Sequence, residues 1–442
     1  MFINISIYSD INRLKISFLI ITLMLCYGNN NTLGAKNVLD NTKFVENYCL
    51  PSIKSVKAYR TGRDLNNPIV ELNSDETITV EFDDLSDEGS SYDYTFIHCT
   101  YNWQSSDLIY MDYCNGFEYN RVDNYRNSMG TIQSYIHYSL SFPNDQVNFK
   151  ISGNYILKVV DSYDHDKVVL LQRFMVVEPK LSMNAKIRQS LDPSLTFTSQ
   201  QMELEVDVKP LGSIDPDHDI VTVVCQNGQT DNQLVGIKST YISQDKIRYT
   251  SPECLIFDGC NEYRNINIKS YSYQTPQIVR IENYGAEMHV RLSPDFNNFR
   301  QDYSENPDLD GKYIVKRDDS NDSNVEADYA WVYFTLNIPE LENTDVYVYG
   351  EFTGWAINPD YKLTYNHQSN SYELKALLKQ GYYNYRYVTV DGASGIVSHS
   401  RLEGNHYSTE NTYQVTVFYK SPSVRYWRLV GIKTISSRFT VN

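Results

Sequence analysis

The sequence is short of positive charge. Its 442 residues contain 39 Lys and Arg against 55 Asp and Glu, a formal net charge of −16. Such a chain repels phosphate backbones and offers no basic patch to anionic lipid, so no nucleic acid partner is expected.

The usual signatures of catalysis are also missing. The eight histidines show no HxH, HxxxH or HExxH spacing, and the sequence contains no CxxC, GxSxG, Walker loop or GxGxxG. His98 and Cys99 are adjacent, but neighbours in a strand point to opposite faces, which predicts a buried pair rather than a catalytic dyad. We therefore predict that the protein is not an enzyme, and we expect no catalytic residue and no cofactor.

One acidic segment resembles the start of a calcium loop. Residues Asn306 to Gly311 read NPDLDG, but Arg317 stands at the twelfth position, where an EF-hand needs a glutamate. A second acidic run, Asp215 to Asp219, has no convergent partner and predicts a solvated turn. No metal site is expected.

Long apolar runs are absent after the first 35 residues. Residues 1–35 predict a cleaved secretory signal, because Arg13 and Lys15 precede the apolar run Ile16–Tyr27. That run is shorter than the roughly 20 residues of a membrane span. The mature chain is therefore expected outside the cytoplasm, with no direct membrane insertion.

Cysteine is sparse in the mature chain. An even number in an exported protein permits disulfides without proving them, and the pairing is left open. The six that remain after cleavage are Cys49, Cys99, Cys114, Cys225, Cys254 and Cys260.

Tyrosine is abundant, with 38 Tyr against 17 Phe. A tyrosine buries a large ring but needs a partner for its hydroxyl, so most should lie on strand surfaces and a minority on a partner surface. Apolar and aromatic residues alternate with period two in short runs, for example Tyr92–Trp103 and Thr131–Phe142. This pattern predicts an all-β protein.

The all-β chain is predicted to contain three immunoglobulin-like β-sandwich domains in series after the signal peptide. Aromatic strands and turn-rich connections alternate throughout, and the charged segment KRDDSNDSNVEAD near residue 320 indicates a linker. The predicted boundaries are 1–35 for the signal, 47–179 for the N-terminal domain, 180–317 for the middle domain, 318–328 for the linker and 329–442 for the C-terminal domain.

Eight sequence blocks resemble those of the type IX secretion system plug protein family of Bacteroidota, in the same order. They include FIHCTYNWQSSDL, GTIQSYIHYSLSFPND, ISGNYILKV, VVCQNGQTDN, VYVYGEFTGW and the final NTYQVTVFYKSPSVRYWRLVG. The resemblance implies a non-catalytic periplasmic subunit that plugs the translocon pore. Its implied partner is the large outer-membrane β-barrel translocon, met from the periplasmic side.

Four residues in these blocks are candidates for the motif or for an interface. They are Trp103, Gly153, Asn154 and Tyr155, and their alternative role is to hold the first sandwich together.

The alternative function is an exported glycan-binding protein. The order of strand, GEFTGW, strand and aromatic strand after Val346 resembles early-set immunoglobulin-like glycogen-binding modules. Trp355 stands where such a module places an aromatic that stacks on sugar, and the other interpretation is a tryptophan that packs the turn onto the sandwich. A carbohydrate ligand is expected only under this alternative.

Overall fold

Strands make up nearly all of the regular structure, as the alternating pattern predicts. The computed structural model describes residues 47–440 except 87–88, 213 and 244. The α-helices in this part are single turns, namely α3 (Tyr110–Tyr113), α4 (Pro216–Asp219) and α5 (Ser323–Glu326). The 3-10 turns are η1 (Lys209–Leu211), η2 (Glu351–Thr353), η3 (Pro359–Tyr361) and η4 (Ser437–Thr440). The prediction of an all-β protein is confirmed.

The first sandwich contains a six-stranded sheet in the order β1-β12-β11-β5-β7, with β3 also paired to β12. Its other sheets are the four-stranded sheet β2-β4-β9-β8 and the two-stranded sheet β10-β6. Its strands are β1 (Tyr48–Cys49), β2 (Ile53–Arg60), β3 (Ile69–Glu71), β4 (Ile78–Asp84), β5 (Tyr92–Cys99), β6 (Cys114–Gly116), β7 (Asn120–Arg121), β8 (Tyr125–Asn127), β9 (Ile136–Phe142), β10 (Val147–Phe149), β11 (Gly153–Asp161) and β12 (Val168–Val177). Aromatic rings fill the core, where Phe96 meets Phe142 and Phe149 edge-on at 4.9 and 5.1 Å between centroids.

The second sandwich consists of two sheets. One has the order β13-β14-β18-β17, with β19 also paired to β14, and the other has the order β16-β15-β30-β31. Its strands are β13 (Ser182–Gln189), β14 (Ser199–Asp207), β15 (Ile220–Gln226), β16 (Leu234–Val235), β17 (Tyr241–Ile242), β18 (Lys246–Tyr249), β19 (Ile256–Asp258), β30 (Thr412–Tyr419) and β31 (Arg428–Ser436). One core lies between the two sheets.

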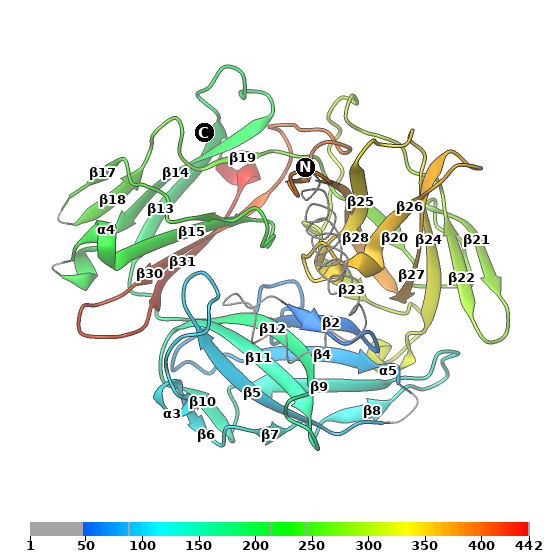
Figure 1. Ribbon diagram of the computed structural model, residues 1–442, viewed down its shortest axis with the longest axis horizontal. Coiled ribbons are helices and arrows are strands. Elements are labelled where there is room, and N and C mark those ends of the chain that lie inside the picture. Colours follow the sequence, from blue (N-terminus) through cyan, green and yellow to red (C-terminus); the bar gives the residue numbers. More distant parts are fainter. Residues whose placement is uncertain (1–46, 87–88, 213, 244, 441–442) are drawn as a thin grey trace, which may run out of the picture. The chain divides into compact units, whose positions relative to one another are not determined.

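The third body is one ten-stranded sheet in the order β20-β28-β25-β26-β27-β24-β22-β21, with β23 and β29 also on β28 (Figure 1). Its strands are β20 (Arg264–Asn267), β21 (Ile278–Asn283), β22 (Met288–Leu292), β23 (Tyr313–Val315), β24 (Tyr329–Leu336), β25 (Thr344–Tyr349), β26 (Lys362–Asn366), β27 (Ser371–Lys379), β28 (Gly381–Asp391) and β29 (Val397–Ser398). Both halves of the sheet share one core.

The sheets do not follow the boundaries predicted at 317 and 329. Strands β20 to β23 precede residue 317 but belong to the third sheet, whereas β30 and β31 follow residue 329 but complete the second sandwich. Val223 on β15 stands opposite Thr416 on β30. Strand pairing depends on complementary faces rather than on distance along the chain, so a boundary cannot be placed from a polar stretch alone.

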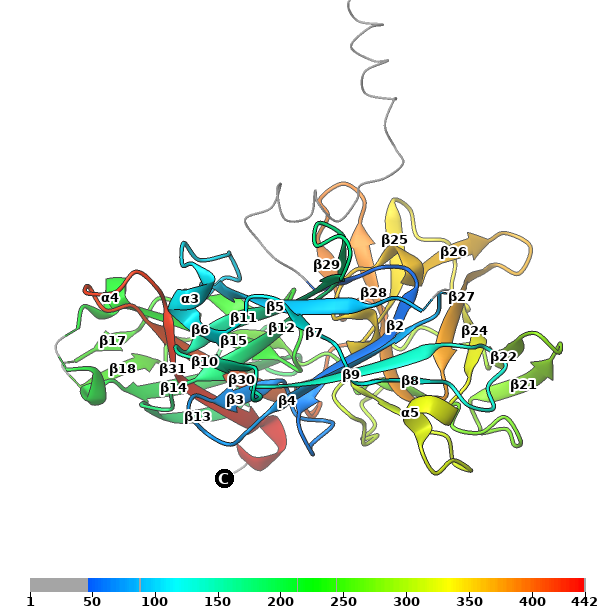
Figure 2. The same cartoon turned by 90° about the horizontal axis from the view of Figure 1, so that it is seen from below.

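The segment predicted as the linker, 318–328, packs against the first sandwich. Val325 in α5 is 1% exposed and Asp328 is 6% exposed. The carboxylate of Asp328 accepts hydrogen bonds from the backbone amides of Ile132 and Gln133, at 2.6 and 3.1 Å. Figure 2 shows α5 beside β8 and β9. The charge of this segment is typical of a solvated linker, yet the buried carboxylate of Asp328 is satisfied by hydrogen bonds to the first sandwich.

A buried ion pair joins the first sandwich to the third sheet. The ammonium of Lys379 lies 2.6 Å from a carboxylate oxygen of Asp83, and both side chains are 2% exposed or less. Tyr329 and His137 also bind Asp83, at 2.7 and 2.8 Å. Burial would raise the pKa of Asp83, but the Lys379 ammonium and His137 hold it below its usual range.

The first and second sandwiches are joined by an apolar cluster and an ion pair. Val177, Val223, Phe418 and Leu429 form the buried cluster. Beside it, Glu178 accepts a hydrogen bond from Arg428 at 3.0 Å. The described residues accordingly fall in one compact unit.

The predicted signal, residues 1–35, lies outside the described residues. In the part that is described, no helix has the length and apolarity to cross a membrane.

Candidate interaction surface

The motif residues predicted from sequence lie together where β5 and β11 meet, and all four are buried. Trp103 is 5% exposed, and the guanidinium carbon of Arg173 lies 4.7 Å from its ring centroid. The amide nitrogen of Asn154 donates to the carbonyl of Thr100 at 3.0 Å and so ties down the turn after β5. Tyr155 is fully buried. These residues hold the first sandwich together and offer no exposed contact face.

Gly153 is needed at its position because a Cβ there would lie 2.5 Å from Nε2 of His98. Burial lowers the pKa of His98 to about 4 and raises that of Cys99 to about 12, so the ring and the thiol are both neutral near pH 7. His98 hydrogen-bonds the hydroxyl of Ser106 through Nδ1 at 2.9 Å. The prediction of a hydrogen-bonded core histidine beside a buried cysteine is confirmed.

The cysteines in the described part are all free thiols. They are Cys49, Cys99, Cys114, Cys225, Cys254 and Cys260. The short loop between Cys254 and Cys260 is therefore not closed by a disulfide in this structure.

Trp355 packs against backbone rather than standing free. A Cβ added to Gly228 would lie 3.7 Å from its Nε1, and one added to Gly311 would lie 2.7 Å from its ring. Tyr349 meets the ring edge-on at 5.8 Å. The indole fills a gap between two turns, which is the packing role that the sequence left open as an alternative to sugar stacking.

The acidic loop after Asn306 uses its carboxylates internally. Asp308 accepts hydrogen bonds from the backbone amides of Tyr263 and Asp310, and Asp310 accepts one from the hydroxyl of Thr412 at 2.6 Å. Burial raises the pKa of Asp308 to about 7. No group of three or more His, Cys, Asp or Glu side chains able to hold a metal occurs in the described residues.

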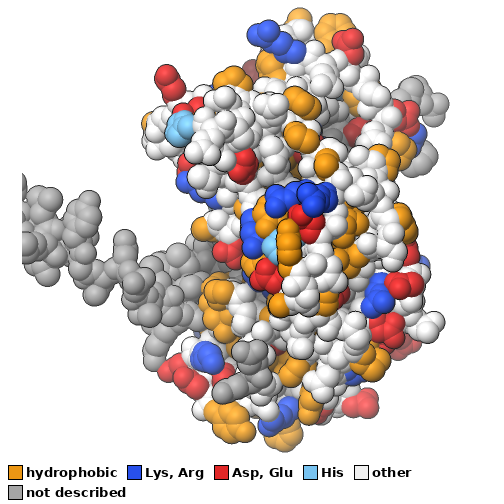
Figure 3. Space-filling model, turned by 90° about the vertical axis from the view of Figure 1, so that its right-hand side faces the viewer, with side chains coloured by type: hydrophobic (Ala, Val, Ile, Leu, Met, Phe, Trp, Pro, Cys, Tyr) orange, Lys and Arg blue, Asp and Glu red, His pale blue; other side chains and the backbone are white. Residues whose placement is uncertain are grey.

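The outer face of β22, β24 and β27 combines aromatic rings with cations. Figure 3 views the side that carries β21 and β22, and shows Lys and Arg side chains gathered around hydrophobic ones. The ammonium of Lys375 lies 4.0 Å from the ring centroid of Trp331, and the guanidinium of Arg291 lies 4.5 Å from that of Tyr333. The cations cover the ring faces, so this surface is no bare platform for a sugar.

The most exposed apolar side chains close together in sequence lie at α3 and β6 of the first sandwich. Ile109, Met111 and Phe117 are 67%, 72% and 81% exposed. We call these three residues the apolar tip. Tyr110 and Tyr113 of the same helical turn face inward and are buried. Large apolar side chains gathered in one exposed segment are typical of a contact surface.

The apolar tip is held in place by backbone contacts on both sides. The carbonyl of Phe117 accepts hydrogen bonds from the hydroxyl of Tyr110 at 2.9 Å and from the side chain of Asn120 at 2.8 Å. Gly116 has φ +99°, and a Cβ there would lie 1.9 Å from the carbonyl oxygen of Gln146. The tip therefore presents its side chains from a preorganised turn, which lowers the entropy lost on binding.

Sequence reasoning missed the apolar tip. The run LIYMDYCNGF forms a short helical turn in the structure, but apolar and aromatic residues are interspersed there. The only available signal was the density of large apolar residues beside Gly116. It does not separate the inward-facing side chains from the outward-facing ones.

Comparison with known families gives a match inside the first sandwich. The family described as type 9 secretion system plug protein, first domain, matches residues 53–178. The chain belongs to this plug family. The matched region of the plug-family chain includes both the buried motif residues and the apolar tip.

A solved structure extends the likeness to nearly the whole chain. The crystal structure of a hypothetical protein from Parabacteroides merdae ATCC 43184, at 2.30 Å resolution, superposes on this plug-family chain with a TM-score of 0.87 and 32% sequence identity. The match covers 90% of this chain and 100% of that one. No curated protein matches the chain.

Proposed function

We propose that this chain is a non-catalytic periplasmic subunit that occludes the pore of the type 9 secretion translocon, and that the apolar tip contacts the pore protein. Plug-family membership carries the proposal and gives the chain a role related to type 9 secretion. In this role the chain is exported by a cleaved signal and acts at the inner side of the outer membrane.

A plug needs bulk and stiffness. Three β bodies joined by a buried ion pair and an apolar cluster supply both, because breaking these contacts would expose charged and apolar groups together. Release requires that the open translocon bind the plug less tightly than the idle one does.

The apolar tip supplies the anchoring side chains. Phe117 and Met111 are more than two-thirds exposed and belong to residue types enriched at the centre of protein interfaces. Each anchor of this kind contributes on the order of 2 kcal/mol when buried against a partner. Removing both should therefore lower the affinity at least tenfold.

The test is recovery of the translocon from a membrane extract in mild detergent, using the full exported chain as bait. Wild type should recover the large pore protein, whereas the double variant Met111→Ser and Phe117→Ser should recover less than a tenth as much. Ile396→Ser is the matched control, because Ile396 is 67% exposed and lies outside the tip.

The outcomes separate the two parts of the proposal. If wild type never recovers the pore protein, the plug function is wrong. If wild type and the tip variant recover it equally, only the assignment of the tip is wrong. A strain that lacks the gene should also become permeable to large antibiotics.

The glycan-binding alternative is not proposed. It depended on Trp355, whose ring packs against Gly228 and Gly311.

A further inference from the structure

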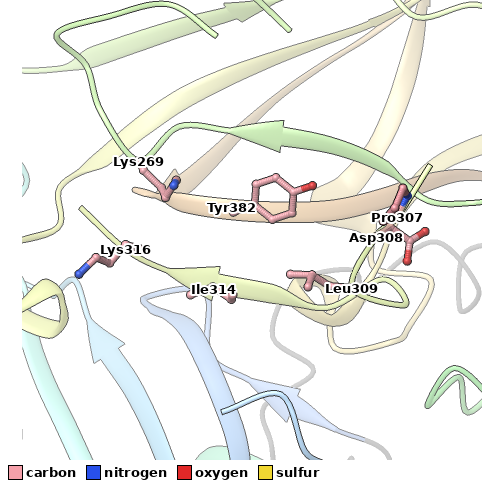
Figure 4. Close-up of a pocket in the computed structure, with 7 residues that line it drawn as sticks. All are labelled: Lys269, Pro307, Asp308, Leu309, Ile314, Lys316 and Tyr382. Carbon is pink, nitrogen blue, oxygen red and sulfur yellow. The ribbon is translucent and has the colours of Figure 1, made fainter. Parts of the chain in front are cut away.

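A pocket of about 370 Å³ opens on the face of the third sheet where β28 begins. Tyr382 at this point pairs with Asn267 of β20 on one side and with Ile314 of β23 on the other. The loop 307–309 closes one end. The pocket is lined by Lys269, Asp308, Leu309, Ile314, Lys316 and Tyr382, together with a proline (Figure 4).

The lining is divided by chemistry. Figure 4 shows the ring of Tyr382 in the middle, Ile314 opposite it, the two lysines at one end and Asp308 at the other. The lining therefore combines an apolar wall with two lysine side chains at one end. Pockets of this size hold small groups oriented by a few polar contacts.

The lysine end of the pocket has hydrogen-bond donors that the described residues do not fully use. The ammonium of Lys316 makes no hydrogen bond or ion pair with any described residue, and that of Lys269 meets Asp318 at 3.5 Å across a partly exposed pair. Two cations lie beside an apolar wall here. They favour an anion attached to an apolar group.

The acidic end does not neutralise the lysines. The carboxylate of Asp308 already accepts two backbone amides, from Tyr263 and Asp310. It therefore has less capacity to receive an ammonium group from the other end of the pocket. Among the described residues, the ammonium of Lys316 has no partner, and that of Lys269 has only the partly exposed carboxylate of Asp318.

We propose that this pocket binds an extended protein segment in which a carboxylate stands beside a large apolar side chain. The carboxylate meets Lys269 and Lys316, and the apolar side chain lies on Tyr382 and Ile314. The same chemistry can come from an acidic side chain or from the carboxyl terminus of a chain. The inference does not depend on the plug function.

The test uses the full mature protein and fluorescein-labelled peptides in fluorescence polarisation. The first peptide is Gly-Ser-Glu-Leu-Phe with fluorescein on its amino end and an amidated carboxyl end, the second has glutamine in place of glutamate, and the third combines glutamine with a free carboxyl end. At least one carboxylate-bearing peptide should bind ten or more times more tightly than the neutral one. The tighter of the two shows whether the pocket prefers an acidic side chain or a carboxyl terminus.

Variants assign the binding to this pocket. The double variant Lys269→Glu and Lys316→Glu should bind the carboxylate-bearing peptide at least ten times more weakly than wild type. The double variant Lys186→Glu and Lys209→Glu changes the net charge equally at exposed positions of the second sandwich, and it should bind like wild type. Circular dichroism spectra matching wild type confirm that each variant is folded.

Three results overturn the proposal. One is equal affinity for the charged and neutral peptides, and another is undiminished binding by the double variant of Lys269 and Lys316. The third is displacement of the peptide by 3-phenylpropionate at the peptide's own concentration, because the pocket would then serve a small apolar carboxylate and not a protein segment.

Discussion

Replacing Lys379 with methionine should destabilise the protein by about 3–5 kcal/mol, the cost of breaking a buried ion pair. Methionine keeps most of the alkyl chain, so the change removes chiefly the ammonium group. Asp83, which is 1% exposed, then loses a partner at 2.6 Å, and the carbonyl of Asn324 loses one at 2.8 Å.

An exposed ion pair of the same kind provides the control. Lys362 lies 2.7 Å from Asp345, but the side chains are 44% and 47% exposed. An exposed pair contributes about 0–1 kcal/mol, so Lys362→Met should cost less than about 1 kcal/mol. The two substitutions are chemically identical and differ in burial.

Urea unfolding followed by tryptophan fluorescence measures both free energies. A double-mutant cycle with Asp83→Asn isolates the coupling, and the double variant should be more stable than the two single losses added together. If Lys379→Met and Lys362→Met cost the same within about 1 kcal/mol, the buried pair does not join the first sandwich to the third sheet as described.

Three further predictions follow from burial and backbone geometry. Burial would raise the pKa of Glu178, but its hydrogen-bonded cations lower it to about 2. Because the folded pKa lies below the unfolded one, up to about 3 kcal/mol of stability that is present above pH 5 is lost as the pH falls toward 2. The variant Glu178→Gln should flatten that loss of stability in acid unfolding curves. A thiol reagent added to native protein should label only Cys49 and Cys254, the two that are not fully buried, and rapid labelling of all six would contradict the structure. Gly116→Ala should destabilise the tip by more than 1 kcal/mol, because its Cβ would clash with Gln146, and unchanged thermal unfolding would refute this.

The positions of many strands could be predicted from the sequence, because side chains of a half-buried strand alternate with period two. The alternating run Tyr92–Trp103 contains β5, which begins at Tyr92 and ends at Cys99. The strand expected from Thr131 begins only at Ile136. The backbone amides of Ile132 and Gln133 instead donate hydrogen bonds to the carboxylate of Asp328, which is distant in sequence. No local sequence pattern indicates such a contact.

The partners of the strands could not be predicted. The apolar faces of β15 and β30 are equally compatible with several neighbours, and their pairing joins residues that lie far apart in the chain. The apolar tip was hidden for a related reason. Ile109 and Tyr110 are both large and apolar, and only the packing of α3 on the sandwich decides which one faces solvent.

The pairing of β15 with β30 also constrains the order in which the sheets can form as the chain is made. The second sandwich cannot close until the chain has been made as far as Tyr419, after all the strands of the third sheet up to β29. Until then β15 has a bare hydrogen-bonding edge, which is a site for aggregation. A chaperone that shields extended segments during this interval would raise the yield of folded protein, and a chain truncated before Thr412 would be degraded rather than partly functional.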